Sequence, residues 1–156
     1  HTMQHTETAK DDTAVQSERI SWRGLPISAL LAAVAAAVAN SLVFFGASAL
    51  GFIPQSVLIP TAGGESPLTL GMVAISSIIG AVGAAAVFAV IALFVRHPVR
   101  LFRIVAVLVL VLSFATPLTI PGAPLSMILS MEAMHVVAWA VIVRLLTTAV
   151  RRETSA

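Results

Sequence analysis

Two ionisable residues stand inside a long apolar segment near the C-terminal end of the chain. Glu132 and His135 are three residues apart, so on a helix their side chains would be neighbours on one face. An ionisable group within hydrocarbon costs about 2.5–3.5 kcal/mol on insertion scales, so it normally faces a bundle interior or water. A carboxyl beside an imidazole can share a proton or form an ion pair, which suits acid/base catalysis. Glu132 and His135 are therefore the candidate catalytic residues.

The elements that must position this pair are apolar segments long enough to cross a membrane. The 156 residues are 58% hydrophobic and 10% charged, whereas a soluble domain carries roughly 25% charged residues. A spanning helix needs about 20 apolar residues. Four segments near or above that length cover residues 25–50, 68–95, 101–118 and 124–148. None alternates like a barrel strand, so the sequence predicts an all-α fold, an integral membrane four-helix bundle.

The segments that flank these spans are polar. Residues 1–22 mix charges of both signs and lack the apolar core of a signal peptide, so they predict a mostly disordered tail. Met3 is interpreted as the native start, preceded by two residues left by cloning. The four-span domain is then expected over residues 23–149, with a cytoplasmic tail over residues 150–156.

The distribution of positive charge predicts the orientation of the spans. All nine Lys and Arg residues belong to the N-terminal tail, to the connection between the second and third spans, or to the C-terminal end. Because positive charge accumulates on the cytoplasmic side, both termini are expected in the cytoplasm of a bacterial inner (plasma) membrane. Loops 51–67 and 117–123 are then expected outside. The apolar loop 51–67 is predicted either to lie at the interface or to fold back over the bundle as a lid.

In that orientation the strongly polar side chains of the spans gather in the outer half of the bilayer. A rise of about 1.5 Å per residue puts Glu132 and His135 roughly 10–17 Å below the outer surface. The same arithmetic puts Asn40 roughly 22 Å from the cytoplasmic end of the first span. We expect these groups to surround a small pocket. Its candidate ligand-binding residues are Asn40, Ser76, Ser77, Thr116 and Trp139.

Small residues must let the spans approach one another, because lipid offers no hydrophobic drive between helices. The first span carries two Ala-rich stripes at four-residue spacing, and the second carries Ser76, Gly80 and Ala84. These stripes predict close packing of the first two spans. They would equally suit a contact between protomers, so a homodimer stays open.

Three functions fit this arrangement. The first is a pocket that binds a small or lipophilic ligand, with acid/base chemistry by Glu132 and His135. The second is a structural or assembly subunit of a membrane complex, in which the polar side chains only hold the helices together. The third is a proton-coupled transporter of small molecules. Alanine at either ionisable position would abolish turnover in an enzyme, and would chiefly lower thermal stability in a structural subunit.

Composition limits the partners and cofactors of the chain. Membrane lipid is the expected surrounding, and no nucleic-acid partner is expected, because the basic residues flank spans and do not cover a soluble face. The chain has no cysteine, so it has no thiolate ligands. Glu-x-x-His is half of a di-iron site, but the sequence has no second copy, so no metal is expected. No cofactor is indicated by any motif.

Three segments carry a resemblance to known proteins. They are AVANSL at the end of the Ala-rich first span, the basic connection RHPVRLFR, and the last span MEAMHVVAWAVIVRLL. The region 25–148 resembles a family of small, uncharacterised four-helix membrane proteins of bacteria, which implies the four-span fold and no established activity. Small multidrug transporters also have four spans and an essential membrane Glu. Theirs lies in the first span, where this chain has no carboxylate.

Overall fold

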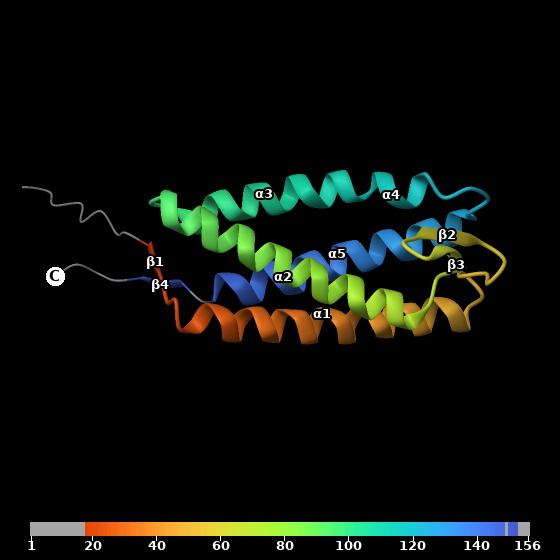
Figure 1. The fold of residues 1–156 in the computed structure, drawn as a ribbon, viewed down its shortest axis with the longest axis horizontal. Coiled ribbons are helices and arrows are strands. Elements are labelled where there is room, and N and C mark those ends of the chain that lie inside the picture. Colours follow the sequence, from red (N-terminus) through yellow and green to blue (C-terminus); the bar gives the residue numbers. More distant parts are fainter. Residues whose placement is uncertain (1–17, 149, 153–156) are drawn as a thin grey trace, which may run out of the picture.

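Four long helices run side by side along the long axis of the protein in the computed structural model, which describes residues 18–148 and 150–152 (Figure 1). They are α1 (Gly24–Ala49), α2 (Leu70–Phe94), α3 (Pro98–Ser113) and α5 (Leu125–Thr147). The short helix α4 (Ala115–Leu118) continues α3, and together they form an apolar segment of 21 residues. All four segments are long and apolar enough to cross a membrane, which confirms the predicted number of spans.

Local sequence explains where the helices begin and end. After α1, Gly51 adopts a φ of +73°, a conformation that glycine accepts without strain. The Gly51 N–H then donates to the Ser48 carbonyl and the Phe52 N–H to the Ala47 carbonyl, which is the Schellman arrangement of a helix C-terminus. Thr69 caps α2 by accepting a hydrogen bond from the Met72 N–H. Pro98 starts α3, where its missing N–H has no partner to lose.

Two antiparallel strand pairs lie at opposite ends of the bundle. Strand β2 (Leu58–Thr61) pairs with β3 (Gly64–Pro67) in a hairpin, at the end we call the hairpin end. Strand β1 (Glu18–Ile20) pairs with β4 (Val150–Arg152), so the two chain ends meet at the opposite end, the terminal end. The sequence predicted only polar tails for the segments of β1 and β4, and an interfacial loop or a lid for the segment that contains the hairpin. The remaining tail residues, 1–17 and 153–156, lie outside the described part of the chain.

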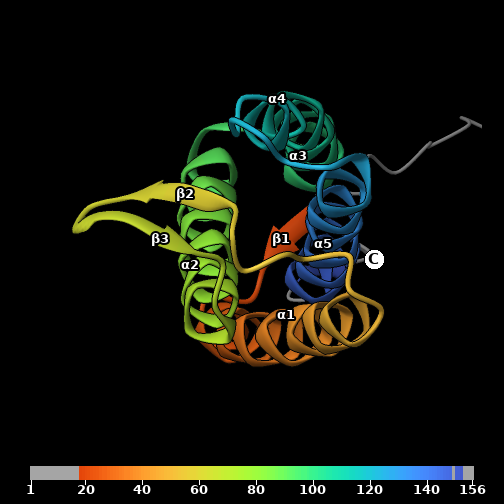
Figure 2. The same cartoon turned by 90° about the vertical axis from the view of Figure 1, so that its right-hand side faces the viewer.

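Figure 2 looks along the bundle. It shows α1 between α2 and α5, and α3 across the bundle from α1. The most extensive helix contacts are those of α1 with α2 and with α5. Helix α3 contacts its neighbours less and is held mainly near the terminal end, where Phe102 packs against Phe88 with ring centroids 4.6 Å apart. Phe88 and Phe102 are both almost fully buried, so this ring pair is the main anchor of α3.

The buried apolar side chains form two separate clusters. The terminal-end core joins alanines of α1 and α2 to the Phe88–Phe102 pair and to Ile142 and Leu146 of α5. The hairpin-end core combines Phe44, Val73 and methionines of α5 with buried residues of loop 51–69. In that loop Ile53 and Val57 are buried, so the start of the segment does fold onto the bundle. The hairpin itself projects sideways past α2 (Figure 2).

Of the predicted small-residue stripe of α2, Ala84 packs against the terminal-end core, but the other two members do not face the bundle. Ser77 and Ala81 are buried, whereas Ser76 and Gly80 are exposed. A Cβ added at Gly80 would meet nothing within 4 Å. The error arises because four-residue spacing is equally regular on every face of a helix, and α2 is apolar all around. On α1 the predicted alanines Ala32, Ala33 and Ala36 are buried.

Candidate functional site

Polar side chains gather where the two apolar cores meet. They are those of Asn40, Ser77, Glu132, His135 and Trp139, and we call this group the polar layer. On α1 the layer lies between Ala36 of the terminal-end core and Phe44 of the hairpin-end core. On α2 Ser77 lies between Val73 and Ala81 in the same way. On α1 and α2 the polar layer therefore has hydrocarbon on both sides along the bundle axis, whereas on α5 its residues alternate with residues of the two cores.

Asn40 and Ser77 join α1 to α2 by a direct hydrogen bond. The Asn40 Nδ2 donates to the Ser77 Oγ at 2.9 Å, and the Ser77 Oγ donates to the Val73 carbonyl at 2.7 Å. Both side chains are more than nine-tenths buried, with 6% of Asn40 and 5% of Ser77 exposed. The sequence placed Asn40, Ser76 and Ser77 around one predicted pocket, and of the two serines it is Ser77 that bonds to Asn40.

Of the α5 members, His135 lies at about the same depth as Asn40, and Glu132 and Trp139 lie on either side of it. The Ser126 Oγ donates to the Phe52 carbonyl, so the start of α5 is level with the end of α1. At about 1.5 Å per residue, Asn40 is about 14 Å inside α1 from its hairpin end, and His135 is about 15 Å inside α5. Glu132 lies about 5 Å nearer the hairpin end and Trp139 about 6 Å farther from it.

Glu132 and His135 are not bonded to each other in this structure. The His135 Nδ1 lies 2.8 Å from the Met131 carbonyl, one turn back on the same helix. A carbonyl only accepts, so Nδ1 carries the proton of this bond, and Nε2 is the nitrogen left for another partner. Among the described residues neither a hydrogen bond nor an ion pair links the Glu132 carboxyl to this ring. Each of the two side chains can therefore hydrogen-bond to a third group.

Three atoms of the polar layer are buried without any hydrogen-bond partner in the described part of the chain. They are the Asn40 Oδ1, the Glu132 Oε2 and the Trp139 Nε1. A buried polar atom left unpaired costs about 1–3 kcal/mol, so native structures keep few of them. The fourth such atom, the Ser48 Oγ, lies near the hairpin end of α1. The orphaned atoms thus concentrate on residues that the sequence had singled out.

Two predicted ligand-binding residues lie away from the polar layer. Ser76 is exposed on α2, and its Oγ donates to the Val73 carbonyl of its own helix. Thr116 is exposed in α4, on the helix that packs least closely. Sequence reasoning also passed over Ser130, which is buried and donates to the Ser126 carbonyl. Ser130 lies four residues after Ser126, a spacing that lets a helical serine hydroxyl donate to the carbonyl one turn back, and this was the available sequence signal.

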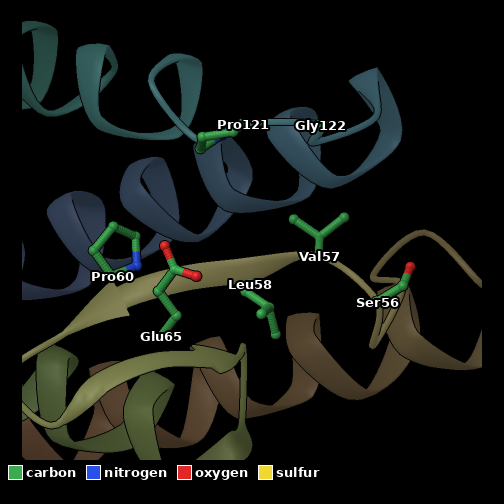
Figure 3. Close-up of a pocket in the computed structure, with 7 residues that line it drawn as sticks. All are labelled: Ser56, Val57, Leu58, Pro60, Glu65, Pro121 and Gly122. Atoms are coloured by element: carbon green, nitrogen blue, oxygen red, sulfur yellow. The ribbon is translucent and has the colours of Figure 1, made fainter.

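A separate pocket lies at the hairpin end. Its volume is about 400 Å³, and it is bounded by the β2–β3 hairpin and by the loop between α4 and α5 (Figure 3). The lining residues are Ser56, Val57, Leu58, Pro60, Glu65, Pro121 and Gly122. None of the polar-layer residues borders it. The sequence signal that was available is Glu65, a single charge in an otherwise uncharged apolar loop.

Metal ligation and similarity to known proteins complete the description of the site. Within the described ranges, no three His, Asp or Glu side chains lie close enough together to hold a metal ion.

No curated protein and no solved structure matches the chain. The model of one protein family does match it, over residues 20–152, which include all four long apolar helices and strand β4. The chain therefore belongs to DUF6069, a family of unknown function.

Proposed function

We propose that this protein is a multi-pass protein of the bacterial inner membrane that binds a small lipophilic molecule in its polar layer. The observation that carries the proposal is the group of three orphaned atoms on Asn40, Glu132 and Trp139. A bound molecule with a hydroxyl or carbonyl group would pair with those of the three atoms that lie within its reach, and would remove that part of the cost of leaving them unsatisfied.

The chemistry of these atoms specifies the ligand class. The Asn40 Oδ1 accepts hydrogen bonds, the Trp139 Nε1 donates one, and the Glu132 carboxyl accepts when ionised and donates when protonated. The cores on either side are apolar. A ligand with one polar group that both donates and accepts, such as a phenol or an alcohol on an apolar body, complements this layer. Glu132 and the free His135 Nε2 are suited to acid/base chemistry on that polar group.

The orientation of the protein in the membrane follows from its charges. The described arginines Arg23, Arg96, Arg100, Arg103 and Arg144 all lie toward the terminal end, where the two chain ends also meet. The positive-inside rule then supports cytoplasmic termini and a hairpin end on the outer side. Asn40 is about 24 Å from the terminal end of α1 and about 14 Å from the other end. The polar layer would therefore belong to the outer half of the bilayer.

Cysteine labelling tests this orientation directly, because the chain has no native cysteine. Ala62→Cys, in the hairpin turn, is expected to react with a membrane-impermeant maleimide in spheroplasts. His97→Cys, between α2 and α3, is expected to react only after the membrane is permeabilised. Labelling of His97→Cys in sealed spheroplasts would contradict the orientation.

Ligand binding is tested with 4-butylphenol and with butylbenzene, which has the same apolar body and no hydroxyl. We expect the full chain in neutral detergent to bind the phenol at least tenfold more tightly. Trp139→Phe keeps an aromatic ring and removes the N–H, so it should reduce this preference, as should Glu132→Leu. Trp22→Phe is the matched control, because Trp22 is exposed at the terminal end.

The second candidate function is a structural subunit without a ligand, and the buried Asn40–Ser77 bond between α1 and α2 favours it. In that case the phenol and butylbenzene would bind equally. The Glu132 and Trp139 variants would then change only the unfolding temperature. Equal binding of the two probes would therefore contradict the ligand-binding proposal.

A further inference from the structure

We infer that the pocket at the hairpin end binds the protonated amine of an amphiphilic molecule, with Glu65 as the counter-charge. This site is distinct from the polar layer, because the residues that line it come from the β2–β3 hairpin and the two loops that meet there. The inference rests on the position of Glu65, on the apolar wall beside it and on the distribution of charge along the bundle.

Strand pairing directs Glu65 toward the pocket. Glu65 is the cross-strand partner of Pro60, and Leu58 lies two residues before Pro60 on β2. Opposite residues of a pair and alternate residues of a strand point to the same face, so these three side chains share one face of the hairpin. The other face carries Ile59, which packs against the hairpin-end core. Figure 3 shows the Glu65 carboxylate extending toward the loop that contains Pro121.

The carboxylate of Glu65 has no compensating charge nearby. Neither a hydrogen bond nor an ion pair engages it within the residues that the structure describes. Glu65 is the sole charged side chain of residues 51–69 and 119–124, the loops of the hairpin end. The described arginines all belong to the terminal end, at the far side of the bundle. A cation that enters this pocket would therefore meet a net negative charge.

The rest of the pocket suits an apolar body attached to that cation. The carboxylate lies at one end of the pocket and Ser56 at the other (Figure 3). The apolar surface between them is supplied by Val57, Leu58, Pro60 and Pro121. The volume of about 400 Å³ is within the range of roughly 300–1,000 Å³ that small-molecule sites occupy. Prolines stiffen both walls, so the pocket is formed without a ligand.

The position of the pocket at the end of the spans gives the amine two sources. A headgroup of a primary-amine lipid could reach it from the membrane surface, and a free amphiphilic amine could reach it from solution. Both present the same chemistry to Glu65, an ammonium group on an apolar chain.

The test measures binding of octylammonium to the full chain in neutral maltoside micelles, with empty micelles as the baseline. Octanol has the same chain without the charge, and ethylammonium has the charge without the chain. We expect each to bind at least tenfold more weakly than octylammonium. Glu65→Gln is expected to reduce octylammonium binding at least tenfold, to the level of octanol.

Ser66→Ala is the matched control for Glu65→Gln. Ser66 is the next residue of β3 and lies on the opposite face of the hairpin, so its variant should bind octylammonium as the unchanged chain does. Glu65 is exposed and unpaired, so Glu65→Gln should keep the unfolding temperature. Octylammonium binding that survives Glu65→Gln, or that octanol equals, would overturn the inference.

Phosphatidylcholine nanodiscs with and without phosphatidylethanolamine distinguish the two sources. Competition of phosphatidylethanolamine with octylammonium would identify a lipid headgroup as the occupant. Octylammonium binding that is the same in both nanodiscs and is lost with Glu65→Gln would identify a soluble amine. Loss of Glu65 dependence in both nanodiscs would overturn the inference.

Discussion

The two ends of the bundle are built by different means. The terminal-end core consists of helices alone. It contains the alanines Ala32, Ala36 and Ala81, which bring α1 close to its neighbours, and the tilted ring pair of Phe88 and Phe102. The hairpin-end core draws on three helices and two loops, and its gaps are filled by the methionines Met127 and Met134. Small residues fix helices at one distance, whereas methionine adapts to an irregular space.

This difference indicates which end can accommodate a guest. An alanine interface has no long side chain that can move aside, so the terminal half should adapt less to an added molecule. The methionine-rich half can repack around an added molecule at little cost. The polar layer lies against this adaptable half, and the hairpin pocket lies at its outer edge. Substitutions at matched positions of the two ends test the comparison.

The largest expected effect is that of Phe88→Ala in the terminal-end core. Phe88 has no exposed surface and is the main partner of Phe102, so its truncation leaves a cavity where α3 is anchored. The free energy of unfolding should fall by about 3–5 kcal/mol, as measured by thermal unfolding in detergent. Phe45→Ala, at a ring that is 56% exposed, is the control and should change it by about 0.5 kcal/mol or less. Equal losses would contradict the assignment of the anchor.

Overpacking should separate the two ends next. Ala36→Leu adds three carbons where α1 contacts its neighbours and no surface is exposed, so it should cost about 1–3 kcal/mol. Met127→Leu, at an equally buried position of the hairpin-end core, should cost less than about 1.5 kcal/mol. Ala86→Leu, on the exposed face of α2, controls for the added bulk. Similar costs at residues 36 and 127 would remove the distinction between the cores.

The turn before α5 gives a smaller effect at the hairpin end. Gly122 has a φ of +71°, where an L side chain is strained, although a Cβ would meet no neighbour within 4 Å. Gly122→Ala should therefore cost about 1–2 kcal/mol through backbone strain alone. Gly63 has an ordinary φ and equally open surroundings, so Gly63→Ala should be close to neutral. Chemical denaturation of the two variants in the same detergent compares them.

The smallest expected effect belongs to the polar layer. Ser77→Ala removes the partner of the Asn40 Nδ2, but hydrogen bonds between membrane helices average only about 0.6 kcal/mol and reach about 1.7 kcal/mol at most. Ser76→Ala, one position away on the exposed face, should leave stability unchanged. A double-mutant cycle with Asn40→Ala measures the coupling. A coupling energy near zero would mean that the bond contributes nothing to holding α1 against α2.

Much of the architecture could be predicted because hydropathy reports span length directly. The predicted span 25–50 corresponds to α1, and 124–148 corresponds to α5, each within one residue of the observed ends. The β2–β3 hairpin was missed because its apolar residues read as an interfacial loop and its turn, Ala62–Gly63, is a weak turn signal. The β1–β4 pair joins segments far apart in the chain, which local pattern does not reveal.

The members of the candidate site could be proposed from the sequence, but their contacts could not. Polar residues within an apolar segment are conspicuous, and their positions drew attention to Asn40, Glu132 and Trp139. Which of two adjacent serines faces Asn40 depends on the rotation of α2, and an all-apolar helix gives no signal for rotation. The hydrogen bond between His135 Nδ1 and the Met131 carbonyl depends on the rotamer of the histidine side chain. Spacing along the sequence does not determine that rotamer.

The antiparallel pairing of Glu18–Ile20 with Val150–Arg152 makes the chain nearly a closed ring. A short linker from residue 152 to residue 18 would complete that ring, and new ends could be opened at the Ala62–Gly63 turn. Such a circular permutant would keep every helix and both apolar cores. Its new ends would lie at the hairpin end of the bundle, opposite the present ends. It would offer a direct attachment point for reporters beside the amine pocket.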